Sequence, residues 1–391
     1  MTRMTSSDDT ELIESTPPPV TGAWHPGDPP GRRRFAELFT GRPLEVESGS
    51  TIGPVTVAYE AWGTLSPARD NAVLVAHTMT GDSHAAGGAE PGHPSAGWWD
   101  PLIGPGRPID TDRWWVVCCN TFGGCQGTTG PASVAPDGRR YGPRFPVITP
   151  RDQFEVEVAL ADHLGVHRWA AVIGASMGGT RVLEWAVGRP ERVARAVVVG
   201  CGAEATAEQI ALGALQAQAI RVDHGWNGGD YYDLPPGGGP HRGLALARRI
   251  GQLSYRNEGD LASRFGRRAQ TPQDPWRGGR YQVESYLDHQ AAKLVARFDA
   301  NSYLVLRRAM DHHDVGRARG GIRAALGRVT ADVTVIGIDS DRVYPLRLQR
   351  DLAGGLPGRP EVQVVRTPIG HDAVVVEFAQ IGPMLHAALQ R

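Results

Sequence analysis

Eight short segments of this chain have the composition of strands, and helical patterns separate most of them. Several are apolar almost throughout, which is typical of parallel strands covered on both faces. The predicted strands span residues 44–48, 55–59, 72–76, 114–118, 170–173, 196–199, 332–338 and 361–365. The pattern predicts an α/β fold built on a mostly parallel, eight-stranded sheet.

This alternation stops between residues 203 and 328. Helical spacing without strands fills the region, and Gly/Pro-rich stretches separate the predicted helices 207–222, 243–253, 285–297 and 302–313. We expect a helical insertion at 203–328 between two parts of the core, 36–202 and 329–391. Such an insertion would lie over the carboxyl ends of the strands, where open α/β sheets bind ligands. A lid is therefore predicted. An arm for oligomerisation is the alternative, and the two roles are compatible.

Residues 1–35 are predicted to be a disordered leader. The stretches Thr16–Pro19 and Pro29–Arg34 are rich in proline, glycine and arginine, and cannot build a packed core.

Composition argues against several classes of partner. The 41 basic and 42 acidic residues nearly cancel, so neither nucleic acid nor an anionic membrane is an expected partner. No apolar run reaches the ~18 residues of a membrane span, and the N-terminus lacks an apolar signal core, so a cytoplasmic protein is expected. The four cysteines form no C-x-x-C pair, which argues against disulfides and a zinc site. The chain has a single lysine, Lys293, among many arginines, which we attribute to genome base composition.

A possible nucleophile lies in the sequence Gly174-Ala175-Ser176-Met177-Gly178. An apolar run precedes it and a helical pattern follows it. The predicted strand, sharp turn and helix would expose the Ser176 hydroxyl at the top of a sheet, with the glycines relieving the turn. The five-residue pattern is weak by itself, and this setting gives it weight.

A serine hydroxyl needs a base, and that base needs an orienting acid. In α/β-hydrolases the order is Ser, acid, His. After residue 328 only His371 and His386 remain, and His371 alone lies in a loop directly after a predicted strand. Asp339 and Asp341 both follow the preceding strand, and spacing cannot separate them as the acid.

The acyl-transfer intermediate needs two backbone donors for its oxyanion. The residue after the nucleophile, Met177, supplies one. The other is expected in the turn after the third strand, residues 77–84, where we choose Met79.

Several separated stretches of the chain resemble the homoserine O-acetyltransferase family, α/β-hydrolase-fold enzymes of methionine biosynthesis. The resemblance covers residue 40 to the end and rests on residues 77–84, 120–131, 174–178, 243–248, 284–287, 297–303, 339–345 and 370–372. It implies Ser176 as nucleophile, Asp341 as acid and His371 as base. It also implies that Arg248 binds the homoserine carboxylate and that Asp372 contacts the polar end of the substrate.

The resemblance implies ping-pong transfer of an acetyl group from acetyl-CoA to the side-chain hydroxyl of L-homoserine, with no cofactor and with a homodimer expected. Succinyl-CoA as donor and serine as acceptor remain alternatives. A serine esterase is a further alternative, and a non-catalytic binding protein is disfavoured by the complete Ser, Asp and His set. The cluster Asp311-His312-His313-Asp314 resembles metal ligands, but adjacent residues on a helix cannot all face one ion, so no metal is expected.

Overall fold

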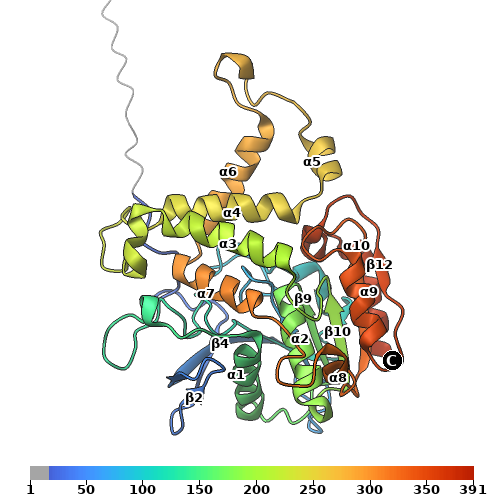
Figure 1. Cartoon of the computed structure of the whole chain (residues 1–391). Coiled ribbons are helices and arrows are strands. Elements are labelled where there is room, and N and C mark those ends of the chain that lie inside the picture. The colour runs from blue at the N-terminus through green and yellow to red at the C-terminus, as the bar shows by residue number, and fades with distance from the viewer. Residues whose placement is uncertain (1–16) are drawn as a thin grey trace, which may run out of the picture.

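One eight-stranded sheet forms the centre of the molecule (Figure 1), as predicted. The computed structural model describes residues 17–391. In spatial order the strands are β1 (Arg34–Leu38), β4 (Val55–Trp62), β8 (Trp115–Cys119), β5 (Ala72–Ala76), β9 (Ala171–Ala175), β10 (Arg195–Val199), β11 (Asp332–Ile338) and β12 (Gln363–Val365). In this order the five pairings from β8 onward are parallel, and β1 and β4 join antiparallel at one edge.

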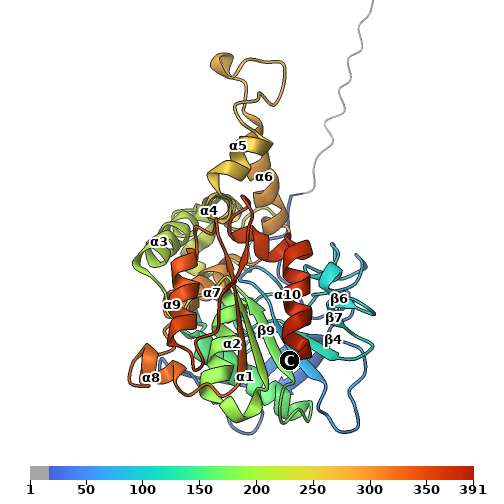
Figure 2. The same cartoon turned by 90° about the vertical axis from the view of Figure 1, so that its right-hand side faces the viewer.

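Helices cover both faces of this sheet (Figure 2). Successive strand residues point to opposite faces, so Leu74 of β5 packs into one core while Val73 and Val75 pack into the other. The core containing Leu74 includes α1 (Pro150–His163), α2 (Met177–Gly188), α8 (Ile322–Leu326) and α9 (Leu346–Gly355), and the opposite core includes α10 (Phe378–Gln390). The buried, apolar strands predicted from the sequence follow from this two-sided cover.

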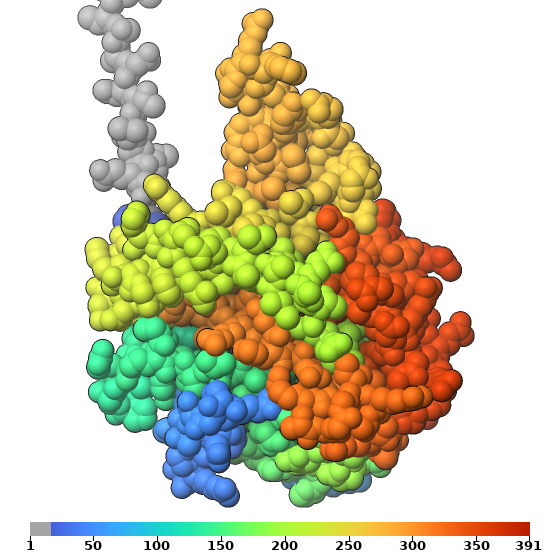
Figure 3. Space-filling view, viewed as in Figure 1, coloured from blue at the N-terminus to red at the C-terminus, as the bar shows by residue number. Residues whose placement is uncertain are grey.

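Five of the α-helices between β10 and β11 form the helical insertion. They are α3 (Ala207–Arg221), α4 (His241–Tyr255), α5 (Glu258–Arg264), α6 (Gln282–Val295) and α7 (Ala300–Asp311). Helices α3, α4 and α7 lie across one end of the sheet, and α5 and α6 form an arm that projects away from the body (Figures 1 and 3). A third apolar cluster joins this insertion to the core. It contains Met79 and Met177 from the core, and Leu244 and Leu306 from the insertion.

The insertion returns to the core earlier than its predicted boundary at residue 328. Val315, Ala325 and Leu326 pack with the sheet and α9. The short helix α8 that carries the last two is therefore part of the core.

The predicted leader is wrong for residues 17–35. Ala23 and Arg33 are buried, Trp24 stacks on Phe35, and the Gly22 amide donates to the carbonyl of Phe298. Proline and glycine prevent regular structure here, but an extended segment can still pack against a finished surface. The remaining part of the predicted leader, residues 1–16, lies outside the described residues.

Two edge elements differ from the sequence prediction. Residues 34–38 form strand β1, which the predicted leader cut in two. The predicted strand 44–48 is shorter in the structure, where only β2 (Leu44–Glu45) forms and pairs with β3 (Thr51–Ile52) outside the main sheet. A further two-stranded ladder pairs β6 (Ile103–Gly104) with β7 (Ile109–Asp110). No helix in the described part of the chain is both long and apolar enough to span a membrane.

Candidate active site

Ser176 lies on a tight turn between β9 and α2. Its backbone has φ 54° and ψ −122°, in the left-handed half of conformational space that most residues avoid. A Cβ on Gly178 would lie 2.0 Å from the carbonyl oxygen of Ala76, and a Cβ on Gly174 would lie 2.5 Å from the backbone of Gly178. Both glycines are therefore required by close packing of the turn, which holds the serine in its strained conformation.

Three residues that are far apart in the sequence meet at this turn. His371 Nε2 lies 2.8 Å from Ser176 Oγ, and His371 Nδ1 lies 2.7 Å from Asp341 Oδ2. Burial disfavours a charge on His371, but the charge and hydrogen bond of Asp341 outweigh this effect and raise the pKa of His371. The arrangement allows His371 to take the Ser176 proton while Asp341 stabilises the resulting imidazolium.

The two candidate aspartates have different partners. Asp341 Oδ1 accepts hydrogen bonds from the amides of Val343 and Tyr344, which leaves Oδ2 directed at His371. Asp339 Oδ1 instead accepts the amide of Thr367. Of the two acids that spacing could not separate, only Asp341 contacts the base.

Ser176 and His371 open into a cavity of about 200 Å³. Met79 lines this cavity beside Ser176, and Met177 follows the serine at the first position of α2. Within residues 17–391, neither the Met79 amide nor the Met177 amide donates to a protein acceptor. Both predicted oxyanion donors are thus free to bind a substrate oxygen.

Arg248 and Asp372 line the same cavity, but their surroundings differ. Arg248 lies 5.5 Å from the ring centre of Tyr255 and has no carboxylate partner among the described residues. Asp372 Oδ2 accepts from Arg256 Nε at 2.8 Å and from Gln252 Nε2 at 2.7 Å. The carboxylate predicted to face the substrate therefore already carries a cationic partner, Arg256, which the sequence reasoning missed.

Other cavity residues were also missed. Trp98, Gln216, Tyr255, Arg297 and Arg307 line it. Arg297 begins one of the stretches that carry the family resemblance, so that stretch contained a usable signal. The rest come from loops and helices whose approach to Ser176 depends on the tertiary fold.

The Asp311–Asp314 segment has structural partners. Asp311 pairs with Arg307 on the same helix, and His313 is buried with Nε2 2.9 Å from the carbonyl of Gly202. The contact of His313 with Gly202 anchors the end of α7 to the loop after β10.

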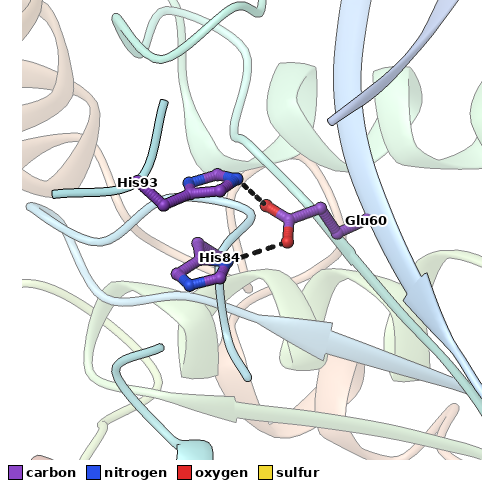
Figure 4. A group of neighbouring side chains, drawn as sticks. All are labelled: Glu60, His84 and His93. Atoms are coloured by element: carbon purple, nitrogen blue, oxygen red, sulfur yellow. Dashed lines mark hydrogen bonds and ion pairs between the residues drawn. The ribbon is translucent and has the colours of Figure 1, made fainter. Parts of the chain in front are cut away.

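A second cluster of possible metal ligands combines Glu60, His84 and His93 (Figure 4), all buried. The two imidazole rings stack at 3.8 Å with 9° between their planes. An ion cannot lie in both ring planes at once, so the stack is unsuited to a single metal. Sequence reasoning missed the cluster because its residues come from three separate segments.

Hydrogen bonds give this cluster a different character. His84 Nδ1 lies 2.9 Å from Glu60 Oε2 and His84 Nε2 lies 3.2 Å from the carbonyl of Gly88, so both nitrogens face acceptors. Burial opposes a charge there, but Glu60 outweighs it and raises the pKa of His84. His93 Nε2 accepts the amide of Arg32, and burial together with Arg33 and His84 lowers the pKa of His93 to about 4. The cluster is a Glu60–imidazolium pair with a neutral histidine stacked on it.

Known proteins share both the sequence and the fold. The family model of the alpha/beta hydrolase fold matches residues 71–377. A homoserine O-acetyltransferase of Thermobifida fusca (strain YX) is 53% identical over 96% of this chain and 99% of the relative. The solved homoserine O-acetyltransferase from Bacillus anthracis has a TM-score of 0.83 at 29% identity, covering 92% of this chain and 97% of that one. The solved esterase E22 has a TM-score of 0.82 at 29% identity, covering 91% and 99%.

Proposed function

The chain belongs to the homoserine O-acetyltransferase family of the alpha/beta hydrolase fold, and on this premise we propose that it transfers an acetyl group from acetyl-CoA to the side-chain hydroxyl of L-homoserine. The observation that carries the proposal is the contact of Ser176, His371 and Asp341 in a cavity that also contains Arg248. This set combines an activated nucleophile with a free guanidinium for a carboxylate.

In the first half-reaction Ser176 Oγ attacks the thioester carbonyl while His371 takes its proton. The amides of Met79 and Met177 bind the oxyanion. The carbon–sulfur bond then breaks, His371 returns the proton to the CoA thiolate, and Ser176 carries the acetyl ester.

In the second half-reaction homoserine enters with its carboxylate on Arg248 and its ammonium near Asp372. His371 takes the proton of the side-chain hydroxyl, which attacks the ester carbon. The bond to Ser176 breaks and Ser176 Oγ regains the proton. These steps need no metal or bound organic cofactor, since acetyl-CoA is itself a substrate.

A serine esterase is the second candidate, favoured by the fold similarity to esterase E22. The two functions share the triad and differ in the acceptor. Arg248 distinguishes them, because an esterase that uses water does not require a carboxylate-binding arginine in this cavity.

The wider proposal is a homodimeric, cytoplasmic enzyme of methionine biosynthesis. The exposed apolar side chains of the helical insertion support the dimer, and the balanced charge supports an enzyme of small molecules rather than of nucleic acid or membranes.

The decisive experiment incubates the purified protein with homoserine and either acetyl-CoA or succinyl-CoA, and with serine in place of homoserine. Free thiol and product mass are both recorded. We expect O-acetylhomoserine to form in step with thiol release. Thiol release with free acetate as the main product would overturn the transferase in favour of the esterase.

A further inference from the structure

A second cavity adjoins the active site. Its volume is about 220 Å³, and it shares Gly81, Trp98, Arg248 and Arg297 with the cavity that contains Ser176. Four shared lining residues make the two spaces neighbours. We call the second space the basic cavity because of the side chains that line it.

Cations dominate the lining of the basic cavity. Arg33, Arg248, Lys293 and Arg297 line it, against the single carboxylate of Asp82. The nearby Glu60 is already paired with His84, which also lines the cavity, so Glu60 does not offset these charges.

Part of this charge has no partner in the protein. Arg33 is only 6% exposed, and its other guanidinium nitrogens bind Pro30, Gly92 and Gln126, but its Nε has no hydrogen-bond partner within residues 17–391. Arg248 Nε is likewise buried and has no hydrogen-bond partner within residues 17–391. Guanidinium charge that the protein does not neutralise favours anions in the adjoining space. In the proposed function the homoserine carboxylate binds Arg248, and no anion is yet assigned to Arg33.

Size gives a second reason. The cavity at Ser176 measures about 200 Å³, below the ~300 Å³ at the lower end for sites that enclose drug-sized ligands. It has room for an acetyl group and a small amino acid, but acyl-CoA is larger than a typical drug. The rest of the acyl donor must leave this cavity, and the basic cavity is the adjoining space.

We propose that the basic cavity binds the phosphate-bearing part of the acyl-CoA, with Lys293 and Arg297 contacting its phosphates. This inference rests on the proposed function and adds a subsite to it. Guanidinium and ammonium groups both bind phosphate oxygens through charge-assisted hydrogen bonds. The thioester end then reaches Ser176 past the residues that the two cavities share.

Lys293 allows a sharp kinetic test. It lies on α6, is exposed, and has no hydrogen bond or ion pair in the described structure. Lys293→Gln should raise KM for acetyl-CoA about threefold to tenfold while leaving kcat unchanged. The kinetics with S-acetylpantetheine, which lacks every phosphate, should stay the same. Lys293→Arg should retain most of the affinity.

The matched control is Arg347→Gln, which removes one exposed positive charge on α9 and lines neither cavity. This substitution should leave KM and kcat unchanged with both acetyl-CoA and S-acetylpantetheine. An equal effect of Lys293→Gln on both donors, or no effect on either, would overturn the phosphate subsite.

A labelling experiment separates this proposal from the proposed function. Because Lys293 is the only lysine, an amine reagent such as trinitrobenzenesulfonate can be followed at this one side chain by peptide mass. CoA should slow the labelling of Lys293, and pantetheine at the same concentration should not. Protection by CoA without acetyl transfer would support the subsite and overturn the function. Acetyl transfer together with equal labelling of Lys293 in CoA and in pantetheine would support the function and overturn the subsite.

Discussion

The two carboxylate oxygens of Asp341 have different hydrogen-bond partners. Oδ1 is held by two backbone amides, and Oδ2 is thereby fixed 2.7 Å from His371 Nδ1. Asp339, two residues earlier, instead accepts a hydrogen bond from the Thr367 amide. Spacing treats these residues alike, and only the hydrogen bonds of the loop distinguish them.

Asp341→Asn should therefore reduce kcat by about a thousandfold or more, because the amide cannot stabilise the imidazolium of His371. Asp339→Asn is the matched control and should reduce it less than tenfold. Initial rates of thiol release from acetyl-CoA measure both. A larger loss in Asp339→Asn than in Asp341→Asn would show that the acid is wrongly assigned.

Arg248 tests whether the cavity selects an amino-acid acceptor. Arg248→Ala should preserve the burst of CoA release, since the triad is intact, but reduce kcat/KM for homoserine about a hundredfold and send more acetyl-enzyme to water. Arg248→Lys should restore only part of this loss, because an ammonium cannot bind both carboxylate oxygens. Rapid-quench and steady-state kinetics separate the two half-reactions. Unchanged homoserine kinetics in Arg248→Ala would remove the carboxylate-binding role.

At the scale of elements, His77 joins the end of β5 to the loop after β8. Its Nε2 accepts the Thr121 amide at 2.9 Å, and its Nδ1 lies 2.6 Å from the carbonyl of Thr78. A neutral ring with its proton on Nδ1 satisfies both contacts. Burial, together with the charge of Arg181, lowers the pKa of His77 to about 3. The turn that carries Met79 thus depends on an uncharged histidine.

This lowered pKa makes stability depend on pH. Between about pH 6.5 and pH 3 the unfolded chain binds a proton at His77 that the folded chain does not, so stability falls as pH falls through this range. One such proton gives a slope of about 1.4 kcal/mol per pH unit. His77→Gln keeps a donor and an acceptor without titrating, and should reduce the slope by about that amount. Urea unfolding at pH 7, 6, 5 and 4 measures it, and parallel curves for both proteins would contradict the assignment.

At the scale of the whole molecule, the sequence predicts what local patterns encode. Continuous apolar runs located the central strands, and the order of Ser176, Asp341 and His371 along the chain follows the order of their strands. The sequence did not predict that residues 17–35 pack against the core. Their composition disfavours regular structure, and their burial depends on the surface beneath them. Arg256 beside Asp372, and Glu60 beside two stacked histidines, were missed for a similar reason: only the tertiary fold brings such partners together.

The helical insertion also differs from the core in what it exposes. Most of the large apolar side chains that remain exposed in residues 17–391 belong to it, including Leu215 on α3, Leu246 and Leu253 on α4, and Trp276 in the arm between α5 and α6, which is 87% exposed. Helices α3 and α4 pack against each other, and the arm projects beyond them (Figure 3). Exposed apolar groups gathered on one part of a surface are typical of an interaction site.

We expect this surface to join two copies of the chain, which is the alternative role that the insertion allowed from its sequence. Leu215→Glu combined with Leu253→Glu should convert a dimer into a monomer in sedimentation velocity, because each charge would be buried at the interface without a partner. Val134→Glu is the control, since Val134 is 56% exposed and lies outside the insertion. Circular dichroism should show that all variants remain folded. A folded double variant that still sediments as a dimer would place the interface elsewhere, and a monomeric parent protein would rule out the dimer itself.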